Sequence, residues 1–109
     1  MSIVARFKKS VNMSPASIRA WLRDPRAKEA SFEATRRRLP RLAELKSKPA
    51  AKWTAADVKL AKRVLSFNAR MEGVVRQHGC SRKALISLRN WGRHIRSCPL
   101  PEKRDKKRG

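Results

Sequence analysis

The longest stretch with one hydrophobic period runs from Trp53 to Gly79, and it predicts the main helix of the chain. Its apolar residues recur mostly at steps of three and four, which places them on one side of an α-helix. They are Leu60, Val64, Phe67, Met71, Val74 and Val75. Thr54 is placed to cap the start with Asp57 three residues on, and Gly79 follows the last turn. We therefore expect a buried apolar face and an exposed basic face on this helix.

Two short amphipathic segments precede the main helix. The first spans residues 3–11, and the second begins at Ser14 and Pro15, a cap residue followed by a proline that fits the first turn. It stops before Asp24, because the residue before a proline avoids the helical region. Two short helices joined by a tight turn resemble a helix-turn-helix, with a plain packed helix pair as the alternative. The candidate groove-reading residues are Ser17, Arg19 and Arg23.

Two further helices are predicted in the middle and near the end of the chain. Between residues 26 and 48 strong helix formers carry an apolar series that Pro40 interrupts, so this helix is expected to restart near Leu39. The series is Ala30, Phe32, Leu39, Leu42 and Leu45. After a linker at residues 46–52 and the main helix, a last helix is expected to start at Ser81 and end at Gly92. Its inward positions are Leu85, Leu88 and Trp91.

These elements predict an all-α protein, a single compact domain of four to five helices over residues 1–98. A chain of 109 residues has room for one core, and apolar residues at helical rather than alternating spacing argue against a sheet. From Pro99 onward the chain has two prolines, no aromatic residue and five cations. Residues 99–109 are therefore expected to form a disordered basic tail.

Charge changes the picture more than any other property of the composition. The chain has 29 Lys and Arg against 8 Asp and Glu, a formal net charge of +21, so a compact fold repels itself unless a polyanion neutralises it. We expect that polyanion to be nucleic acid. Between Glu72 and Glu102 there is no acidic residue, which predicts the least compensated surface there. The candidate phosphate contacts are Arg36, Arg37, Arg38, Arg41, Lys59, Lys62, Arg63, Arg70, Arg76, Arg82, Lys83, Arg89, Arg93 and Arg96.

Signals for other classes of protein are weak. The N-terminus lacks the apolar core of a signal peptide and no run approaches about 20 apolar residues, so we expect a cytoplasmic, nucleoid-associated protein without a membrane partner. No P-loop, dinucleotide-binding glycine motif or Ser-His-Asp arrangement is present, which predicts that the protein is not an enzyme and needs no cofactor. Two cysteines are too few for a disulfide scaffold and predict free thiols.

All histidines and cysteines of the chain fall within 21 residues, with the spacing H-x-C-x13-H-x3-C. They are His78, Cys80, His94 and Cys98. Zinc binds four such ligands in tetrahedral geometry, so a zinc site that joins the ends of the last helix is a minor hypothesis. The spacing is not a familiar zinc-finger pattern, and these residue types also serve as buried or capping residues. We therefore expect no metal.

The tryptophans allow two interpretations. Trp21, Trp53 and Trp91 each lie on or beside an apolar stripe, which favours packing in the core. Aromatic rings in a basic protein also serve as stacking platforms for single-stranded bases. We expect core packing, with base stacking as the alternative.

Several motifs resemble a family of small bacterial proteins of unknown function. The similarity runs from Phe7 to Gly92, through VNMSP, a Trp21-Leu22 pair, TAADVKLAKRV and ISLRNWG, in the order of the family pattern. This chain is far more basic than that pattern and lacks its glycine-rich middle. Some relatives carry a loose DNA-binding label, so the resemblance implies that function.

The sequence as a whole predicts a helical domain that binds duplex DNA mainly through phosphates and with little sequence preference. Such proteins include nucleoid-associated proteins and phage-encoded accessory proteins. RNA binding is the nearest alternative. An adaptor that binds an acidic protein partner is the alternative of a different class.

Overall fold

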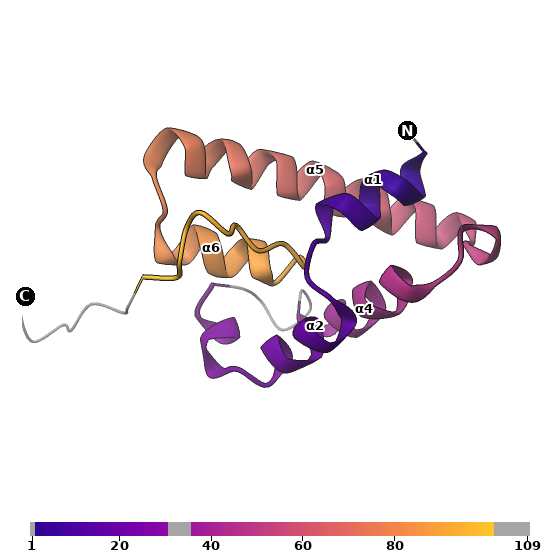
Figure 1. Cartoon of the computed structure of the whole chain (residues 1–109), viewed down its shortest axis with the longest axis horizontal. Coiled ribbons are helices and arrows are strands. Elements are labelled where there is room, and N and C mark those ends of the chain that lie inside the picture. The colour runs from indigo at the N-terminus through magenta and orange to yellow at the C-terminus, as the bar shows by residue number, and fades with distance from the viewer. Residues whose placement is uncertain (1, 31–35, 102–109) are drawn as a thin grey trace, which may run out of the picture.

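The computed structural model describes residues 2–30 and 36–101, and within them lie five complete α-helices and two 3-10 turns (Figure 1). The helices are α1 (Ile3–Ser10), α2 (Pro15–Leu22), α4 (Leu39–Ser47), α5 (Ala55–His78) and α6 (Arg82–Arg89), and the 3-10 turns are η1 (Pro25–Ala30) and η2 (Ala50–Lys52). No strand occurs in these two ranges. The predicted all-α class is therefore confirmed.

Local caps set the helix starts, as the sequence predicts. At α5 the Thr54 hydroxyl accepts the backbone N–H of Asp57 at 3.2 Å, and the Asp57 carboxylate accepts the backbone N–H of Thr54 at 2.9 Å, which is a capping box. The Ser14 hydroxyl accepts the N–H of Ser17 at 3.1 Å at the start of α2, and the Ser81 hydroxyl accepts the N–H of Ala84 at 3.2 Å at the start of α6. These bonds satisfy N–H groups that have no partner within the helix.

Prolines mark where the chain stops and restarts. Helix α2 ends at Leu22, ahead of Pro25, and α4 begins at Leu39 with Pro40 in its first turn. The predicted end of the second helix ahead of Pro25 and the predicted restart near Leu39 are both confirmed. Phe32, which the sequence placed in the apolar series, lies outside the described residues, and so do residues 102–109 of the predicted tail. Within the first part of that tail, Leu100 packs against the core and the Pro101 carbonyl accepts a hydrogen bond from Arg82 at 2.5 Å.

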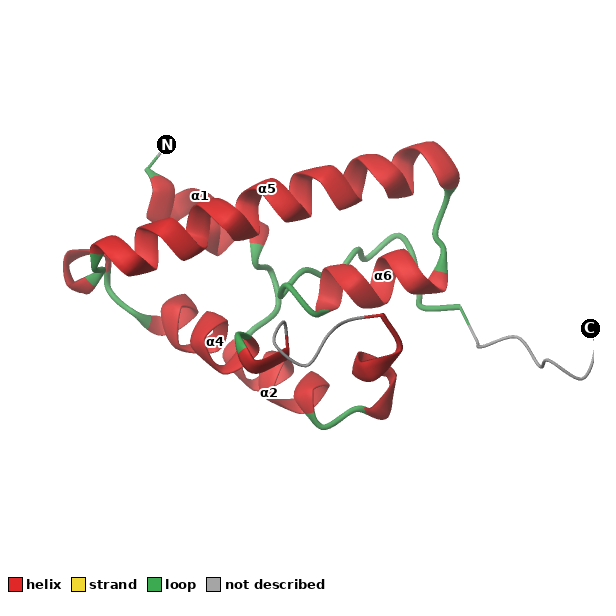
Figure 2. Ribbon diagram, turned by 180° about the vertical axis from the view of Figure 1, so that it is seen from behind, coloured by secondary structure: helices red, strands yellow, loops and turns green. Residues whose placement is uncertain are grey.

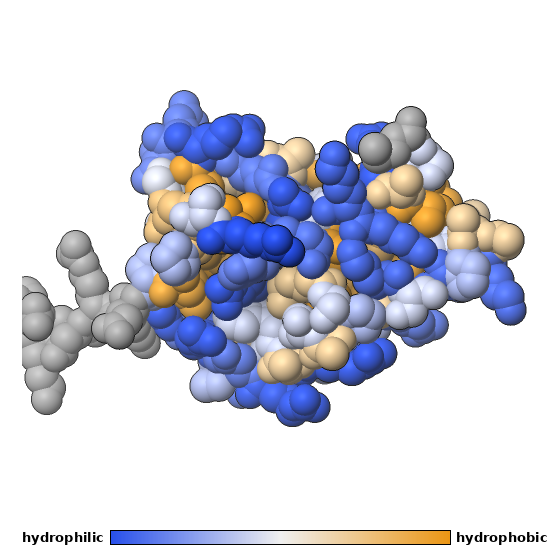
Figure 3. All heavy atoms as spheres, viewed as in Figure 1, coloured by the Kyte–Doolittle hydropathy of each residue, from blue (hydrophilic) through white to orange (hydrophobic). Residues whose placement is uncertain are grey.

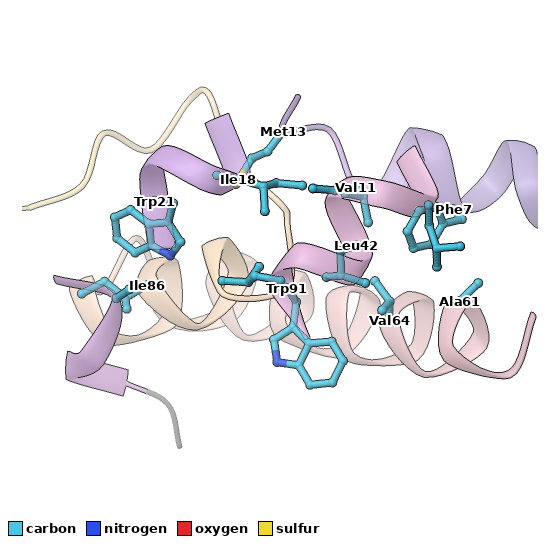
Figure 4. Close-up of a cluster of buried hydrophobic side chains, with 14 residues drawn as sticks. Phe7, Val11, Met13, Ile18, Trp21, Leu42, Ala61, Val64, Ile86 and Trp91 are labelled. Carbon is cyan, nitrogen blue, oxygen red and sulfur yellow. The ribbon is translucent and has the colours of Figure 1, made fainter. Parts of the chain in front are cut away.

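The helices form two pairs with α6 between them. Helix α1 packs along α5, α2 packs on α4, and α6 contacts both α5 and η1 (Figures 1 and 2). A helix-turn-helix would bury α1 and α2 against each other, whereas here their main packing partners are α5 and α4. The core lies between these layers and includes Phe7, Ile18, Leu42, Val64 and Ile86, all fully buried (Figure 4).

The buried face of α5 differs from the predicted stripe. Val64 is buried, whereas Leu60 and Phe67 lie half-buried at the edge of the core, and Met71, Val74 and Val75 are only partly covered. The residues that α5 buries are Asp57, Ala61, Val64 and Asn68. The prediction of a fully buried stripe is wrong, because the true face is centred on a small alanine and includes two polar side chains. The Asp57 carboxylate accepts hydrogen bonds inside the fold, and the Asn68 amide nitrogen donates them.

The two tryptophans nearest α6 lie in the core, as predicted. Trp21 is 5% exposed and its indole N–H donates to the Asn90 side-chain oxygen at 2.8 Å, whereas Trp91 is 8% exposed. Trp53 is half-buried and meets Phe7 edge-on, with ring centroids 5.3 Å apart. Base stacking on Trp21 or Trp91 would require the rings to leave the core.

The first and the last of the segments that carry the motif resemblance lie against each other. The Asn12 side chain donates to the His94 carbonyl and accepts the His94 N–H, both at 2.7 Å, and the Met13 N–H donates to the Gly92 carbonyl at 3.1 Å. Gly92 has a φ of 80°, and a Cβ there would lie 2.6 Å from Val11 Cγ1. Only glycine fits this close approach. These motif residues therefore join the beginning of the fold to its end.

Candidate nucleic-acid interface

The centre of the candidate site is a pair of stacked rings. Phe67 from α5 and Trp91, which follows α6, have ring centroids 4.7 Å apart and planes inclined by 24°. Arg38, just before α4, lies over the Trp91 ring at 5.6 Å from its centroid, and Arg70 lies over the Phe67 ring at 5.8 Å. Each such contact is worth about 0.5–1 kcal/mol at an exposed site. The rings thus hold two guanidinium groups beside the same surface.

A groove of about 460 Å³ runs along α5 next to these rings. Its lining residues are Lys59, Lys62, Arg63, Ser66, Phe67, Arg70 and Trp91. The helical members recur at steps of three and four, so they share one face of α5. The groove therefore combines four cations of one helix with the aromatic pair, and we call this surface the α5 groove.

The cations of the α5 groove make no ion pair within the described part of the chain. Lys59, Lys62, Arg63 and Arg70 make no ion pair with any residue in the described ranges, and neither does Arg38. The acids whose ion pairs lie within the described ranges bind cations outside the groove; these acids are Asp24, Glu29, Asp57 and Glu72. Hydrophilic side chains also dominate the face seen in Figure 3, with smaller apolar patches between them.

Three of the predicted phosphate contacts are instead part of the internal ion pairs. Arg82 binds Glu29 with two contacts of 2.9 Å, Arg93 binds Glu72 and also donates to the Ser10 carbonyl at 3.0 Å, and Arg41 binds Asp57 at 2.9 Å. The prediction that the segment after Glu72 is the least compensated surface is therefore wrong for Arg82 and Arg93. Their acidic partners are distant in sequence, so a local charge count does not detect them.

Asp57 is the most strongly held of these acids. Its carboxylate accepts from Lys48 at 2.7 Å, from the Thr54 N–H at 2.9 Å and from Arg41 at 2.9 Å, while its side chain is 5% exposed. The bond from Lys48, followed by those from Thr54 and Arg41, lowers the pKa of Asp57 well below its ordinary value. This cluster ties α4 to the start of α5.

The remaining predicted contacts do not join the α5 groove. Arg36 and Arg37 make contacts of their own before α4, and Arg76 and Lys83 are exposed on either side of the turn between α5 and α6. Arg89 and Arg96 line a separate pocket beside α2. Sequence reasoning thus placed the four groove cations on one helix, but it did not identify Phe67 as the ring partner of Trp91, since that contact joins α5 to the segment after α6.

The cysteines are not free thiols. Cys80 and Cys98 form a disulfide with their Cα atoms 5.7 Å apart, because the chain after α6 runs back along that helix (Figure 1). The free-thiol prediction is wrong. The zinc hypothesis fails for the same reason: both sulfurs are used, His78 is exposed, His94 lies beside the arginines of the second pocket, and the described ranges contain no cluster of three metal-binding side chains.

No protein-family model matches the chain, and no curated protein or solved structure is significantly similar to it. The motif resemblance to small bacterial proteins therefore stays a prediction. Among the described helices, none combines the length and the apolar character that a bilayer span requires.

Proposed function

We propose that the α5 groove binds the phosphate backbone of nucleic acid, with duplex DNA as the main ligand and little sequence preference. The observation that supports this most is the set of four groove cations without an acidic partner among the described residues. Such a surface attracts an anion, and release of the counterions around the polymer drives binding. The net charge of +21 favours the same class of partner.

The chemistry of the lining favours phosphates over bases. Reading a base edge in the major groove usually takes bidentate side chains at fixed positions, whereas Lys59, Lys62 and Arg63 are exposed and bonded to no described side chain. The Trp91 ring is 8% exposed, which leaves little surface for a base to stack on. Contacts of this kind position a protein on nucleic acid without reporting its sequence.

The test compares two triple variants of equal charge. In the groove variant, Lys59, Lys62 and Arg63 are replaced by Gln. In the control variant, Arg19, Arg23 and Lys28 are replaced by Gln. These are also exposed and make no ion pair in the described ranges, but Arg19 lies on α2, Arg23 directly follows that helix and Lys28 lies on η1. We expect the groove variant to bind a random duplex at least tenfold more weakly than the control at the same salt concentration, with circular dichroism confirming that both fold.

The same titrations separate the alternatives. Binding of unrelated duplexes with similar affinity supports backbone recognition, whereas one sequence that resists a large excess of random DNA would contradict it and restore the groove-reading interpretation of α2. Stronger binding of duplex RNA would assign the groove to RNA. If neither polymer binds and nuclease treatment leaves an acidic protein partner attached, the adaptor alternative replaces our proposal.

A further inference from the structure

A second pocket of about 530 Å³ lies between α2, the end of α6 and the segment that follows α6. It shares no lining residue with the α5 groove. The polar and aromatic side chains important here are Ser14, Ser17, Trp21, Arg89, His94 and Arg96. Cations and hydroxyl groups therefore face one concave space, and all of them come from elements whose positions the fold fixes.

Arg89 is the strongest indication of a ligand. Its side chain is half-buried, and its guanidinium carbon lies 5.3 Å from the centre of the Trp21 ring, which is itself buried. No acidic side chain or hydrogen-bond acceptor in the described ranges binds this guanidinium. Burial lowers the pKa of Arg89, which shows that its charge is held at a cost. An anion in the pocket would offset that cost.

Asp24 also lines the pocket, but its charge is already neutralised. Arg26 binds the Asp24 carboxylate through several contacts, the shortest at 2.6 Å, and mainly through these bonds the pKa of Asp24 falls to about 2. The pair of Asp24 and Arg26 thus contributes little net charge. Arg89 and Arg96 remain as the unbalanced cations of the pocket.

His94 reports the positive potential of the pocket. The two 2.7 Å hydrogen bonds with the Asn12 side chain fix the backbone of His94, and the residue lines the pocket. Burial lowers the pKa of His94, and repulsion from Arg89 and then Arg96 lowers it further. The charges of Arg89 and Arg96 therefore both reach the imidazole of His94.

We propose that this pocket binds a phosphate group, with Arg89 and Arg96 as its charged contacts and the Ser17 hydroxyl, which accepts from the Ser14 hydroxyl at 3.0 Å and still has its own proton to donate, as a neutral donor. Guanidinium groups match phosphate in charge and in hydrogen-bond geometry. The phosphate belongs either to a second stretch of nucleic acid or to a small phosphorylated molecule. The proposal stands apart from that for the α5 groove, because it rests on different residues.

Inorganic phosphate is the first probe, and the two histidines provide the readout. During a titration at constant ionic strength, the His94 imidazole resonance should move to saturation and its pKa should rise, whereas His78, exposed at the end of α5, should barely change. Arg89→Gln and Arg96→Gln should each weaken the response at least tenfold. Arg23→Gln, at an exposed position directly after α2 that does not line the pocket, is the matched control.

Two outcomes would overturn the proposal. One is a non-specific response, in which the His94 resonance moves no more than that of His78, or chloride at the same ionic strength moves it as far as phosphate does. The other is an unchanged response in Arg96→Gln, whose exposed side chain should leave the fold intact even if Arg89→Gln unfolds. Once phosphate binding is established, the same titration with a short duplex and with a nucleoside monophosphate identifies which of the two carries the bound phosphate. A duplex titration of the groove variant then shows whether the pocket binds the duplex without the α5 groove.

Discussion

Single polar side chains join segments of this chain that are far apart in sequence. Asn90 accepts the Trp21 indole N–H at 2.8 Å and donates to the Ala27 carbonyl at 2.9 Å, while being 1% exposed. Lys46 donates to the carbonyls of Lys8 and Val11 and so covers the end of α1. Such bonds contribute modestly when made, but a buried group left without its partner costs about 1–3 kcal/mol. Substitution of these polar side chains should therefore destabilise the fold, as substitution of its apolar side chains does.

Gly92→Ala should destabilise the fold by about 2–5 kcal/mol, which combines the cost of a left-handed backbone with that of overpacking. The added Cβ would lie 2.6 Å from Val11 Cγ1. Urea denaturation of a double-mutant cycle with Val11→Ala separates the backbone cost from the overpacking cost. In the Val11→Ala background, the Cβ of residue 11 would lie at an ordinary contact distance of 3.5 Å from the Cβ added at residue 92. Equal costs of Gly92→Ala in both backgrounds would contradict the steric explanation.

Acid should weaken the fold through Asp57. Because the pKa of Asp57 is lowered in the folded state, its carboxylate stabilises the protein fully above the unfolded value of about 3.9 and loses that effect as the pH falls toward the folded value. Asp57→Asn should therefore reduce stability at neutral pH and flatten the decline of the unfolding free energy between pH 5 and pH 2. Glu44→Gln, which removes an exposed carboxylate without a described ion pair, should keep the full decline.

At the scale of helices, the sequence predicts where a helix begins better than it predicts which face of the helix is buried. Caps such as Thr54 and Ser81 act within a few residues, so they can be identified from the chain alone, and both are confirmed. The buried face of α5 depends on what packs against it. Asn68 is buried because its amide donates to the Ser10 hydroxyl at 3.0 Å, a contact that hydrophobic periodicity cannot include.

Removal of the disulfide should lower the free energy of unfolding by about 3 kcal/mol, since the bond closes a loop between residues 18 apart. We expect the double variant Cys80→Ala and Cys98→Ala and the reduced wild type to unfold at a similar urea concentration, below that of the oxidised protein. Alkylation under non-reducing conditions, followed by mass spectrometry, should find no free thiol. Two alkylated cysteines in the folded protein would contradict this bond.

At the scale of the whole molecule, charge composition favours a class of partner but does not indicate which surface would bind it. The α5 cations could be identified in advance because they share a helix face, whereas Arg38 reaches the same site only through its contact with Trp91. Conversely, the sequence predicts Arg82 and Arg93 to be without acidic partners, whereas in the fold they form ion pairs with Glu29 and Glu72. Tertiary pairing of charges thus decides which cations remain for a ligand.

The salt dependence of DNA binding distinguishes a local contact surface from the general field of a basic protein. Each phosphate that a cation neutralises adds about −0.9 to the slope of log affinity against log salt. The groove and control variants both lower the formal net charge of +21 by three. If the α5 groove makes the contacts, the groove variant should reduce the slope by about 2–3, whereas the control should keep the wild-type slope.

A diffuse field would give a different result, because two variants of equal charge would then lose affinity and slope alike. Equal losses would show that the phosphates meet the positive charge of the molecule as a whole, and they would contradict the assignment of Lys59, Lys62 and Arg63 as contacts. Gel-shift or anisotropy titrations of one random duplex at several salt concentrations supply both slopes. The comparison holds at any absolute affinity, since it depends only on where on the fold the three charges are removed.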